Sequence, residues 1–100
     1  LETRELLARP DFLYDDWPGL SRRAGYSPAY LTTLFKNEFG ITPYQFYLKT
    51  RLDRAAAALA ESDASIRQIS IECGFQNIES FYRAFKRRFG KTPNQYRAHH

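Results

Sequence analysis

The side chains best suited to chemistry are basic, and they gather near the end of the chain. Six Lys and Arg residues, and no Asp or Glu, lie between residues 81 and 100: Arg83, Lys86, Arg87, Arg88, Lys91 and Arg97. Cations grouped in this way attract a polyanion through long-range Coulomb forces. A basic face that is simply hydrated has the same composition, so charge alone leaves both interpretations open.

Residue groups typical of enzymes and metal sites do not occur in the sequence. The only histidines are His99 and His100, and two adjacent terminal histidines do not make a metal site. They are either native residues or the start of a purification tag. Neither a glycine-rich phosphate loop nor a nucleophile elbow is present. We therefore expect no enzyme activity, cofactor or metal within this chain.

Composition and length indicate one helical domain taken from a longer protein. The chain has 100 residues, of which 43% are hydrophobic, and it begins with Leu1 rather than Met. Residues 1–16 carry a net charge of −3 within a total of +4, so the rest carries +7. The single cysteine, Cys73, excludes an internal disulfide and is expected to be a small buried thiol in a reducing compartment. No apolar stretch approaches the ~20 residues of a membrane span, so no membrane contact is expected.

One segment of the chain occurs twice, fifty residues apart. Residues 35–43 read FKNEFGITP, and residues 85–93 read FKRRFGKTP. The match extends to Gln45 with Gln95 and Phe46 with Tyr96, and upstream, with a shift of one, to Leu20 with Ile69, Gly25 with Gly74 and Tyr26 with Phe75. Similarity on this scale indicates two copies of one structural unit.

Each copy predicts two helices joined by a tight glycine turn. In the first copy, Gly25 ends one helix and Ser27 caps the next, which begins with proline. In the second copy, residues 65–68 form a capping-box pattern, Gly74 marks the turn and Asn77 can cap the following helix. Helical spacing predicts an inward face made of Leu31, Leu34, Phe35 and Phe39 in one copy and Phe81, Phe85 and Phe89 in the other. This arrangement is the helix-turn-helix motif.

A longer helix is expected to join the two units. Residues 43–59 combine strong helix formers with an apolar stripe of Leu48, Leu52, Ala55, Ala56 and Leu59. Short helices are expected from Glu2 to Ala8 and after Pro93. The predicted architecture is all-α, with about seven helices in a single DNA-binding domain over residues 1–100. Its parts are a first helix-turn-helix at 17–42, a linker helix at 43–61, and a second helix-turn-helix with a closing helix at 65–98.

These residues resemble the DNA-binding domain of the AraC/XylS family of bacterial transcription regulators. The resemblance covers about residues 17–98 and rests on residues 20–39, on Arg51-Leu52 and above all on residues 69–97. Gly74-Phe75, Phe81, Arg83-Ala84-Phe85-Lys86, Phe89-Gly90, Thr92-Pro93 and Gln95-Tyr96-Arg97 look like that family's signature segment. Ser21 and Ser70 stand where family members often have alanine, and we expect serine to be small enough for the same helix contact. The acidic opening before Pro18 is less typical and leaves the placement of the first helix open.

The resemblance implies a function and a set of partners. It implies recognition helices that enter successive major grooves of double-stranded DNA, in a regulator of the bacterial cytoplasm that is either an activator or a repressor. A contact with RNA polymerase is expected if it is an activator. The effector ligand and the dimer contacts would belong to a domain absent from this chain. The alternative is a helical module whose basic face binds an acidic protein, which would not need two outward-facing helix N-termini.

Seven outward side chains near the starts of the two recognition helices are the candidate base readers. N-terminal residues of such helices usually meet base edges, and these positions also match the base-reading positions of the family pattern: Ala29, Thr32 and Thr33, then Ile78, Glu79, Ser80 and Arg83. Arg83 can donate two bonds to guanine, worth ~1–3 kcal/mol of discrimination, or it can bind a phosphate or water. Glu79 can accept from cytosine, repel wrong sequences, or pair with Arg83 on its own helix. We expect the second unit to supply more of the hydrogen-bonded readout.

A second set of residues is expected to bind phosphates, which fixes register without reading sequence. Its members are Arg22, Arg23, Ser27, Lys36, Arg51, Ser65, Lys86, Arg87 and Lys91. The two serines belong to it through the helix N-termini that they open, and about half of the basic members are expected to matter. Because two units lie in one chain, one domain is expected to bind one asymmetric site of about 17–20 bp, from half-sites about one helical turn apart.

Overall fold

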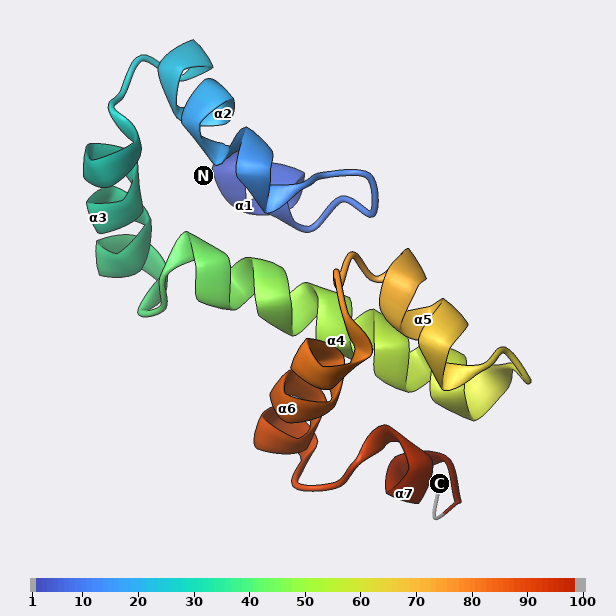
Figure 1. The fold of residues 1–100 in the computed structure, drawn as a ribbon. Helices are drawn as coiled ribbons and strands as arrows, with labels where there is room; N and C mark the ends of the chain where they lie inside the picture. Colours follow the sequence, from blue (N-terminus) through green and yellow to red (C-terminus); the bar gives the residue numbers. More distant parts are fainter. Residues whose placement is uncertain (1, 99–100) are drawn as a thin grey trace. The chain divides into compact units, whose positions relative to one another are not determined.

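Every regular element of the chain is helical in the computed structural model, which describes residues 2–98 (Figure 1). Within these residues there are seven α-helices: α1 Glu2–Leu7, α2 Trp17–Arg23, α3 Pro28–Phe39, α4 Pro43–Glu61, α5 Ile66–Glu72, α6 Ile78–Phe89 and α7 Pro93–Ala98. A short 3-10 helix, η1 Tyr14–Asp16, precedes α2. The prediction of an all-α fold with about seven helices is confirmed over this range. His99 and His100, whose origin the sequence leaves open, lie outside it.

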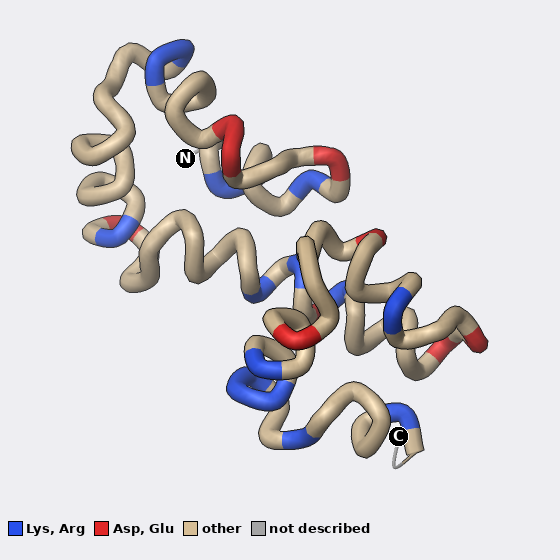
Figure 2. The backbone as a smooth tube through the Cα atoms, viewed as in Figure 1, with Lys and Arg blue, Asp and Glu red and all other residues tan. Residues whose placement is uncertain are grey.

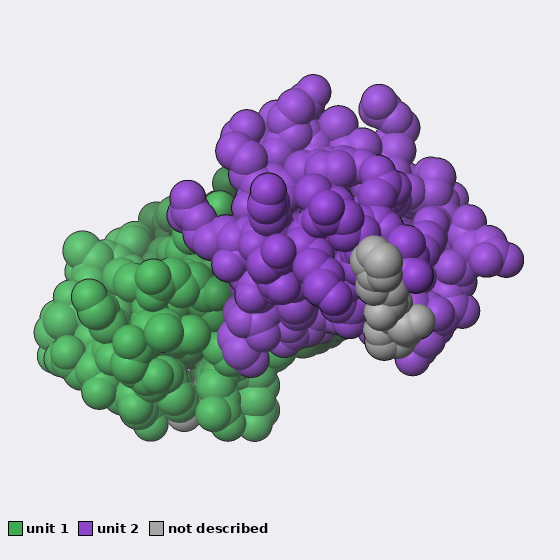
Figure 3. All heavy atoms as spheres, turned by 90° about the horizontal axis from the view of Figure 1, so that it is seen from below, with its two compact units in different colours: residues 1–48 green, residues 49–100 purple. Residues whose placement is uncertain are grey.

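The chain divides into two compact units, residues 1–48 and residues 49–100 (Figure 3). The first contains α1, η1, α2, α3 and the start of α4, and the second contains the rest of α4 with α5, α6 and α7. Each unit therefore contains, beside its other helices, a short helix, a turn and a helix of 12 residues in succession: α2 and α3 in the first unit, α5 and α6 in the second. The expected linker helix is α4, which extends to Glu61.

Apolar side chains from every helix of the first unit form its core. The buried members are Leu7, Trp17, Leu20, Leu31, Phe35 and Tyr47. Leu7 shows that the opening helix packs into this core, which settles the placement that the acidic opening left uncertain. Trp17 is 4% exposed and stacks on Tyr14 with ring centroids 5.9 Å apart. Its indole N–H donates to Oγ1 of Thr32 at 3.2 Å, so a hydrogen bond joins α2 to α3 in addition to packing.

The second unit has a core of aromatic rings and short α4 side chains. Phe81 and Phe85 are fully buried, and the rings of Phe75 and Tyr96 lie 5.2 Å and 5.4 Å from them, respectively. On the α4 side the buried residues are Leu52, Ala55, Ala56 and Leu59, with Ile69 of α5. Most of the predicted apolar face of each recognition helix is thus buried or half-buried, as its spacing indicates.

The turns of the two units have the same backbone geometry. In the first turn, Gly25 N–H donates to Arg22 O and Tyr26 N–H donates to Ser21 O, both at 3.0 Å. In the second, Gly74 N–H donates to Ile71 O and Phe75 N–H to Ser70 O, also at 3.0 Å. This pair of bonds is the Schellman motif, and it requires a left-handed residue where both glycines lie, with φ of 88° and 90°. The sequence repeat therefore corresponds to a repeat of the same two backbone hydrogen bonds in each turn.

Two small serines support these turns from inside. Ser21 and Ser70 are 0% and 2% exposed. Their hydroxyls donate to Trp17 O and Arg67 O, each at 2.8 Å, so neither is a buried polar group without a partner. Serine in place of alanine is thus compatible with the close helix contact.

The predicted helix starts are confirmed, with one difference in detail. Ser27, Ser65 and Asn77 cap α3, α5 and α6, and their side chains accept from the backbone N–H three residues later at 3.2, 3.0 and 2.8 Å. The capping box predicted for residues 65–68 is only half formed, because the amide of Gln68 donates to Glu72 at 3.1 Å. Complete capping boxes occur elsewhere, at Thr42 with Gln45 and at Thr92 with Gln95.

Candidate nucleic-acid interface

The first recognition helix, α3, has fewer free polar groups than its sequence suggests. Ala29 and Thr33 are exposed, while Thr32 is half-buried. Thr32 donates its hydroxyl hydrogen to Pro28 O at 2.8 Å and accepts from Trp17, as described above. Thr33 donates its own to Ala29 O at 3.2 Å. Both predicted readers therefore have methyl groups and acceptor lone pairs to offer, but their hydroxyl donors are in use.

The second recognition helix, α6, carries the long polar side chains. Glu79 and Arg83 are exposed, and Ile78 and Ser80 are half-buried. The Arg83 guanidinium donates to Ser80 Oγ at 3.3 Å, a contact that holds it beside the first turn of the helix. No ion pair joins Glu79 to Arg83 in the part of the chain that the structure describes, so the intrahelical pair, one of the three roles left open for Glu79, is not formed. The carboxylate of Glu79 thus faces solvent.

Most of the residues expected to bind phosphates are at the surface. Figure 2 shows Lys and Arg gathered along α6. The exposed members of the predicted set are Arg22, Arg23, Ser27, Lys36, Ser65, Lys86, Arg87 and Lys91. The hydroxyl oxygens of Ser27 and Ser65 already accept a backbone N–H each, so what these residues open to solvent is the helix N-terminus itself.

Arg51 was wrongly placed in that set. It is 3% exposed, on the same stripe of α4 as Leu48, Leu52 and Ala55. One nitrogen of its guanidinium donates to Thr50 Oγ1 at 3.4 Å. A buried guanidinium cannot reach a phosphate, so Arg51 has a structural role.

Two further basic residues are bound within the second unit. Nε and Nη2 of Arg88 lie 2.9 and 2.8 Å from Asp53 Oδ1 on α4. The Arg97 guanidinium donates to the carbonyl oxygens of Leu59, Ser62 and Ala64 at 3.1, 3.1 and 2.8 Å. Cations favour the carbonyl end of a helix, so Arg97 closes the C-terminus of α4. Of the basic cluster at residues 81–100, Arg83, Lys86, Arg87 and Lys91 therefore remain as the cations facing solvent.

The environment of Cys73 makes it a poor nucleophile. Its side chain is half-buried, not fully buried as expected. Burial raises the pKa of the thiol, and the nearby Arg51 and Arg54 oppose this only in part. A thiol with a raised pKa holds little thiolate near neutral pH, which favours a packing role.

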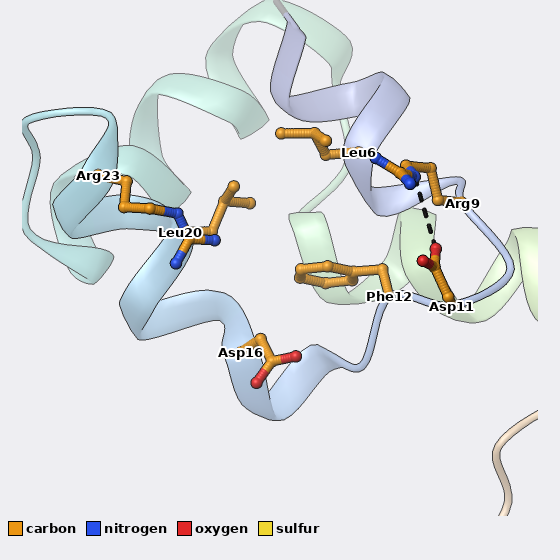
Figure 4. A pocket seen from close by; sticks show the side chains of 7 residues that line it. All are labelled: Leu6, Arg9, Asp11, Phe12, Asp16, Leu20 and Arg23. Carbon is orange, nitrogen blue, oxygen red and sulfur yellow. Dashed lines mark ion pairs between the residues drawn. The ribbon is translucent and has the colours of Figure 1, made fainter.

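The first unit has a shallow cavity away from α3. It has a volume of about 310 Å³ and is lined by Leu6, Arg9, Asp11, Phe12, Asp16, Leu20 and Arg23 (Figure 4). Arg9 and Asp11 form an exposed ion pair at 3.4 Å. The lining of the cavity has two cations and two anions, so it has no dominant charge.

Tyr30 and Tyr82 were missed as candidates. In the fifty-residue repeat, Tyr30 is equivalent to Ser80 and Tyr82 is equivalent to Thr32. Because Ser80 and Thr32 were predicted to read bases, the repeat could have identified both tyrosines as candidates. Tyr30 is 54% exposed. The hydroxyl of Tyr82 accepts from the side-chain amide of Asn94 on α7 at 3.2 Å.

Residues 2–98 contain neither a membrane-spanning helix nor a metal-binding cluster. None of the helices is long and apolar enough to cross a membrane. No group of three or more His, Cys, Asp and Glu side chains is placed to hold a metal ion in this range.

Known proteins share both the sequence pattern and the fold. Residues 20–99 match the family described as "Helix-turn-helix domain". A probable transcriptional regulator of Photobacterium leiognathi, LumQ, is 39% identical over 77 residues, which is 77% of this chain and 31% of LumQ. The chain thus spans under a third of this relative.

Solved structures extend the similarity to three dimensions. An AraC-type transcriptional regulator from Chromobacterium violaceum is 32% identical, with a TM-score of 0.82 over 97% of this chain and 87% of that one. The DNA-binding domain of AdpA, solved in complex with a target DNA, is 28% identical, with a TM-score of 0.77 over 97% of this chain and 84% of that one. With the repeated turns and caps described above, these matches show that the chain belongs to the AraC-type helix-turn-helix family.

Proposed function

We propose that this chain is the sequence-specific DNA-binding part of a bacterial transcription regulator. The observation that carries the proposal is the repeat of one geometry: a 12-residue helix that begins at a side-chain cap after a glycine turn, with its first turns at the surface. A helix presented in this way fits the major groove, and its N-terminal side chains meet base edges. The DNA complex of the similar AdpA domain supports the same reading.

The two units act together as one domain in this proposal. The first helix-turn-helix (residues 17–42), the linker helix (43–61) and the second helix-turn-helix with its closing helix (65–98) supply both recognition helices within one chain. A single helix-turn-helix usually needs a dimer to cover two half-sites ~34 Å apart. We therefore propose that one chain binds one asymmetric site of about 17–20 bp.

Base reading is assigned mainly to α6. Arg83 is the side chain best able to discriminate, because a guanidinium donates two parallel bonds to guanine O6 and N7. Its contact with Ser80 orients it in advance. Glu79, which is also exposed on α6, accepts from a cytosine amine or repels wrong sequences. Ala29, Thr32, Thr33 and Ile78 offer apolar contacts, chiefly to thymine methyl groups.

Phosphate binding is assigned to the exposed cations and helix starts. These are Arg22, Arg23, Ser27, Lys36, Ser65, Lys86, Arg87 and Lys91. If about half of the six cations among them neutralise a phosphate, the slope of log K against log salt concentration is about −2.7, from −0.9 per contact.

Contacts with RNA polymerase, an effector ligand and a second protomer belong to the whole regulator. The chain spans only 31% of its relative LumQ, so these partners are proposed for the intact protein in the bacterial cytoplasm.

A fluorescence-anisotropy titration of random-sequence duplex DNA tests the DNA-binding proposal. The expected result is binding at 50 mM salt that weakens about 40-fold by 200 mM, which follows from a slope of about −2.7. A complete lack of binding at 50 mM salt would contradict the proposal and favour the interaction module that binds an acidic protein.

A further inference from the structure

The first recognition helix lacks free hydrogen-bond donors at the positions predicted to read bases. Ala29 has no polar side-chain atom, and the hydroxyl hydrogens of Thr32 and Thr33 are donated to Pro28 O and Ala29 O. Among residues 28–33, which make the first turns of α3, Tyr30 is the side chain with a free donor. Its hydroxyl makes no hydrogen bond within the described residues.

Tyr30 is held at the surface instead of being packed inside. Its side chain is 54% exposed, and its backbone N–H donates to the Ser27 cap at 3.2 Å, which fixes its place in the first turn. The ring lies 5.5 Å from that of Tyr26, which is itself 41% exposed. An exposed aromatic pair beside a recognition-helix N-terminus is suited to a partner that offers both acceptors and flat or apolar surface.

Comparison of the two units shows that this pair is particular to the first. Tyr26 and Phe75 follow the equivalent turn glycines, but Phe75 is half-buried and packs on Phe81 at 5.2 Å. Ser80, at the position equivalent to Tyr30, accepts from Arg83. The exposed side-chain donor near the start of the recognition helix is thus Arg83 in the second unit and Tyr30 in the first.

We propose that Tyr30 is a DNA-contacting residue of the first unit and that Tyr26 positions its ring. The Tyr30 hydroxyl donates to a hydrogen-bond acceptor of the duplex, either a phosphate oxygen or a base atom such as purine N7. This inference rests on the proposed DNA-binding function.

Removal of one hydroxyl group tests the proposal. Tyr30→Phe keeps the ring and its contact with Tyr26, so the fold is retained, as circular dichroism checks. The matched control is Tyr44→Phe, because Tyr44 is 50% exposed in the same unit but lies on α4. We expect Tyr30→Phe to weaken binding of the selected duplex two- to tenfold, the range of one hydrogen bond, and Tyr44→Phe to leave it unchanged.

The outcomes separate this inference from the proposed function. If the unaltered chain binds DNA and Tyr30→Phe binds equally well, the role of Tyr30 is overturned while DNA binding stands. If the unaltered chain does not bind, both fall. Where Tyr30→Phe loses affinity, selection from random duplexes distinguishes the acceptors. An unchanged motif assigns the bond to a phosphate, and a changed preference at one position assigns it to a base.

Discussion

At the scale of single residues, the two recognition helices differ in the hydrogen-bond donors that they offer to a DNA duplex. The donors of Thr32 and Thr33 are bound to their own helix, whereas the guanidinium of Arg83 is exposed and lightly held by Ser80. Hydrogen bonds carry more sequence information than methyl contacts do. Discrimination is therefore expected to be uneven between the half-sites.

Replacing Arg83 tests this unevenness. Arg83→Ala is expected to lose about 1–3 kcal/mol of preference for its base pair, because the paired bonds to guanine disappear. The double replacement of Thr32 and Thr33 by alanine is expected to relax specificity less. Selection from random duplexes with each variant measures both effects, and the reverse order of losses would refute the assignment.

Lys86 and Arg88 form a matched pair for testing phosphate contacts. The two residues lie two positions apart on α6, and replacement of either one by alanine removes one positive charge. Arg88 is bound to Asp53, while Lys86 is exposed. Lys86→Ala is expected to reduce the salt slope by about one without changing the motif, and Arg88→Ala to change the slope little. Equal effects on the slope would mean that net charge, rather than position, governs binding.

Sequence spacing predicted the roles of some of these residues correctly and missed others, for physical reasons. Arg51 could have been excluded, because it lies three residues after Leu48 and four before Ala55, on the apolar stripe of α4. Tyr30 could have been found from its equivalence to Ser80. The bond from Trp17 to Thr32 could not, since residues fifteen apart on different helices have no fixed spacing that a local pattern reveals.

At the scale of elements, local signals were sufficient to place helix ends. Proline, side-chain caps and glycines at the ends of α3 and α6 act through backbone geometry within a few residues. These signals need no knowledge of tertiary packing. The contacts of Arg97 with residues 59–64 depend on the arrangement of α7 against α4, which only the structure reveals.

The glycines that end the recognition helices are expected to be hard to replace. Gly40 and Gly90 have φ of 81° and 74°, a region that costs an L-residue about 1–2 kcal/mol. Gly40→Ala and Gly90→Ala should therefore lower the thermal unfolding midpoint. Gly19→Ala, within α2, is the opposite control. Its Cβ would meet Arg23 at an ordinary 3.5 Å, and alanine favours the helix by about 1 kcal/mol. A loss of stability at Gly19 with no loss at Gly40 would contradict this account.

Arg97 is expected to hold the second unit together. Arg97→Ala removes three charge-assisted bonds to the end of α4 and the link to α5, so we expect the free energy of unfolding to fall by about 2 kcal/mol. Urea unfolding followed by circular dichroism measures the change. Lys91→Ala, at an exposed cation, serves as the control and should leave stability nearly unaltered. Similar midpoints for both variants would show that the Arg97 contacts add little.

At the scale of the whole molecule, the duplication has a direct consequence for stoichiometry. The chain carries two recognition helices, so a single copy has what most helix-turn-helix proteins obtain by dimerisation. Its charge is also uneven, with −3 over residues 1–16 and +7 over the rest. This asymmetry favours binding of a polyanion to the later part of the chain.

Selection from random duplex DNA with the isolated chain, followed by titration to equivalence on the enriched site, shows whether one chain reads a two-part operator. We expect a motif in two parts, with boxes about one helical turn apart, bound by one chain per site. Binding without enrichment, a motif of one part, or two chains on the minimal site would contradict the claim that both helices of one chain read a single operator.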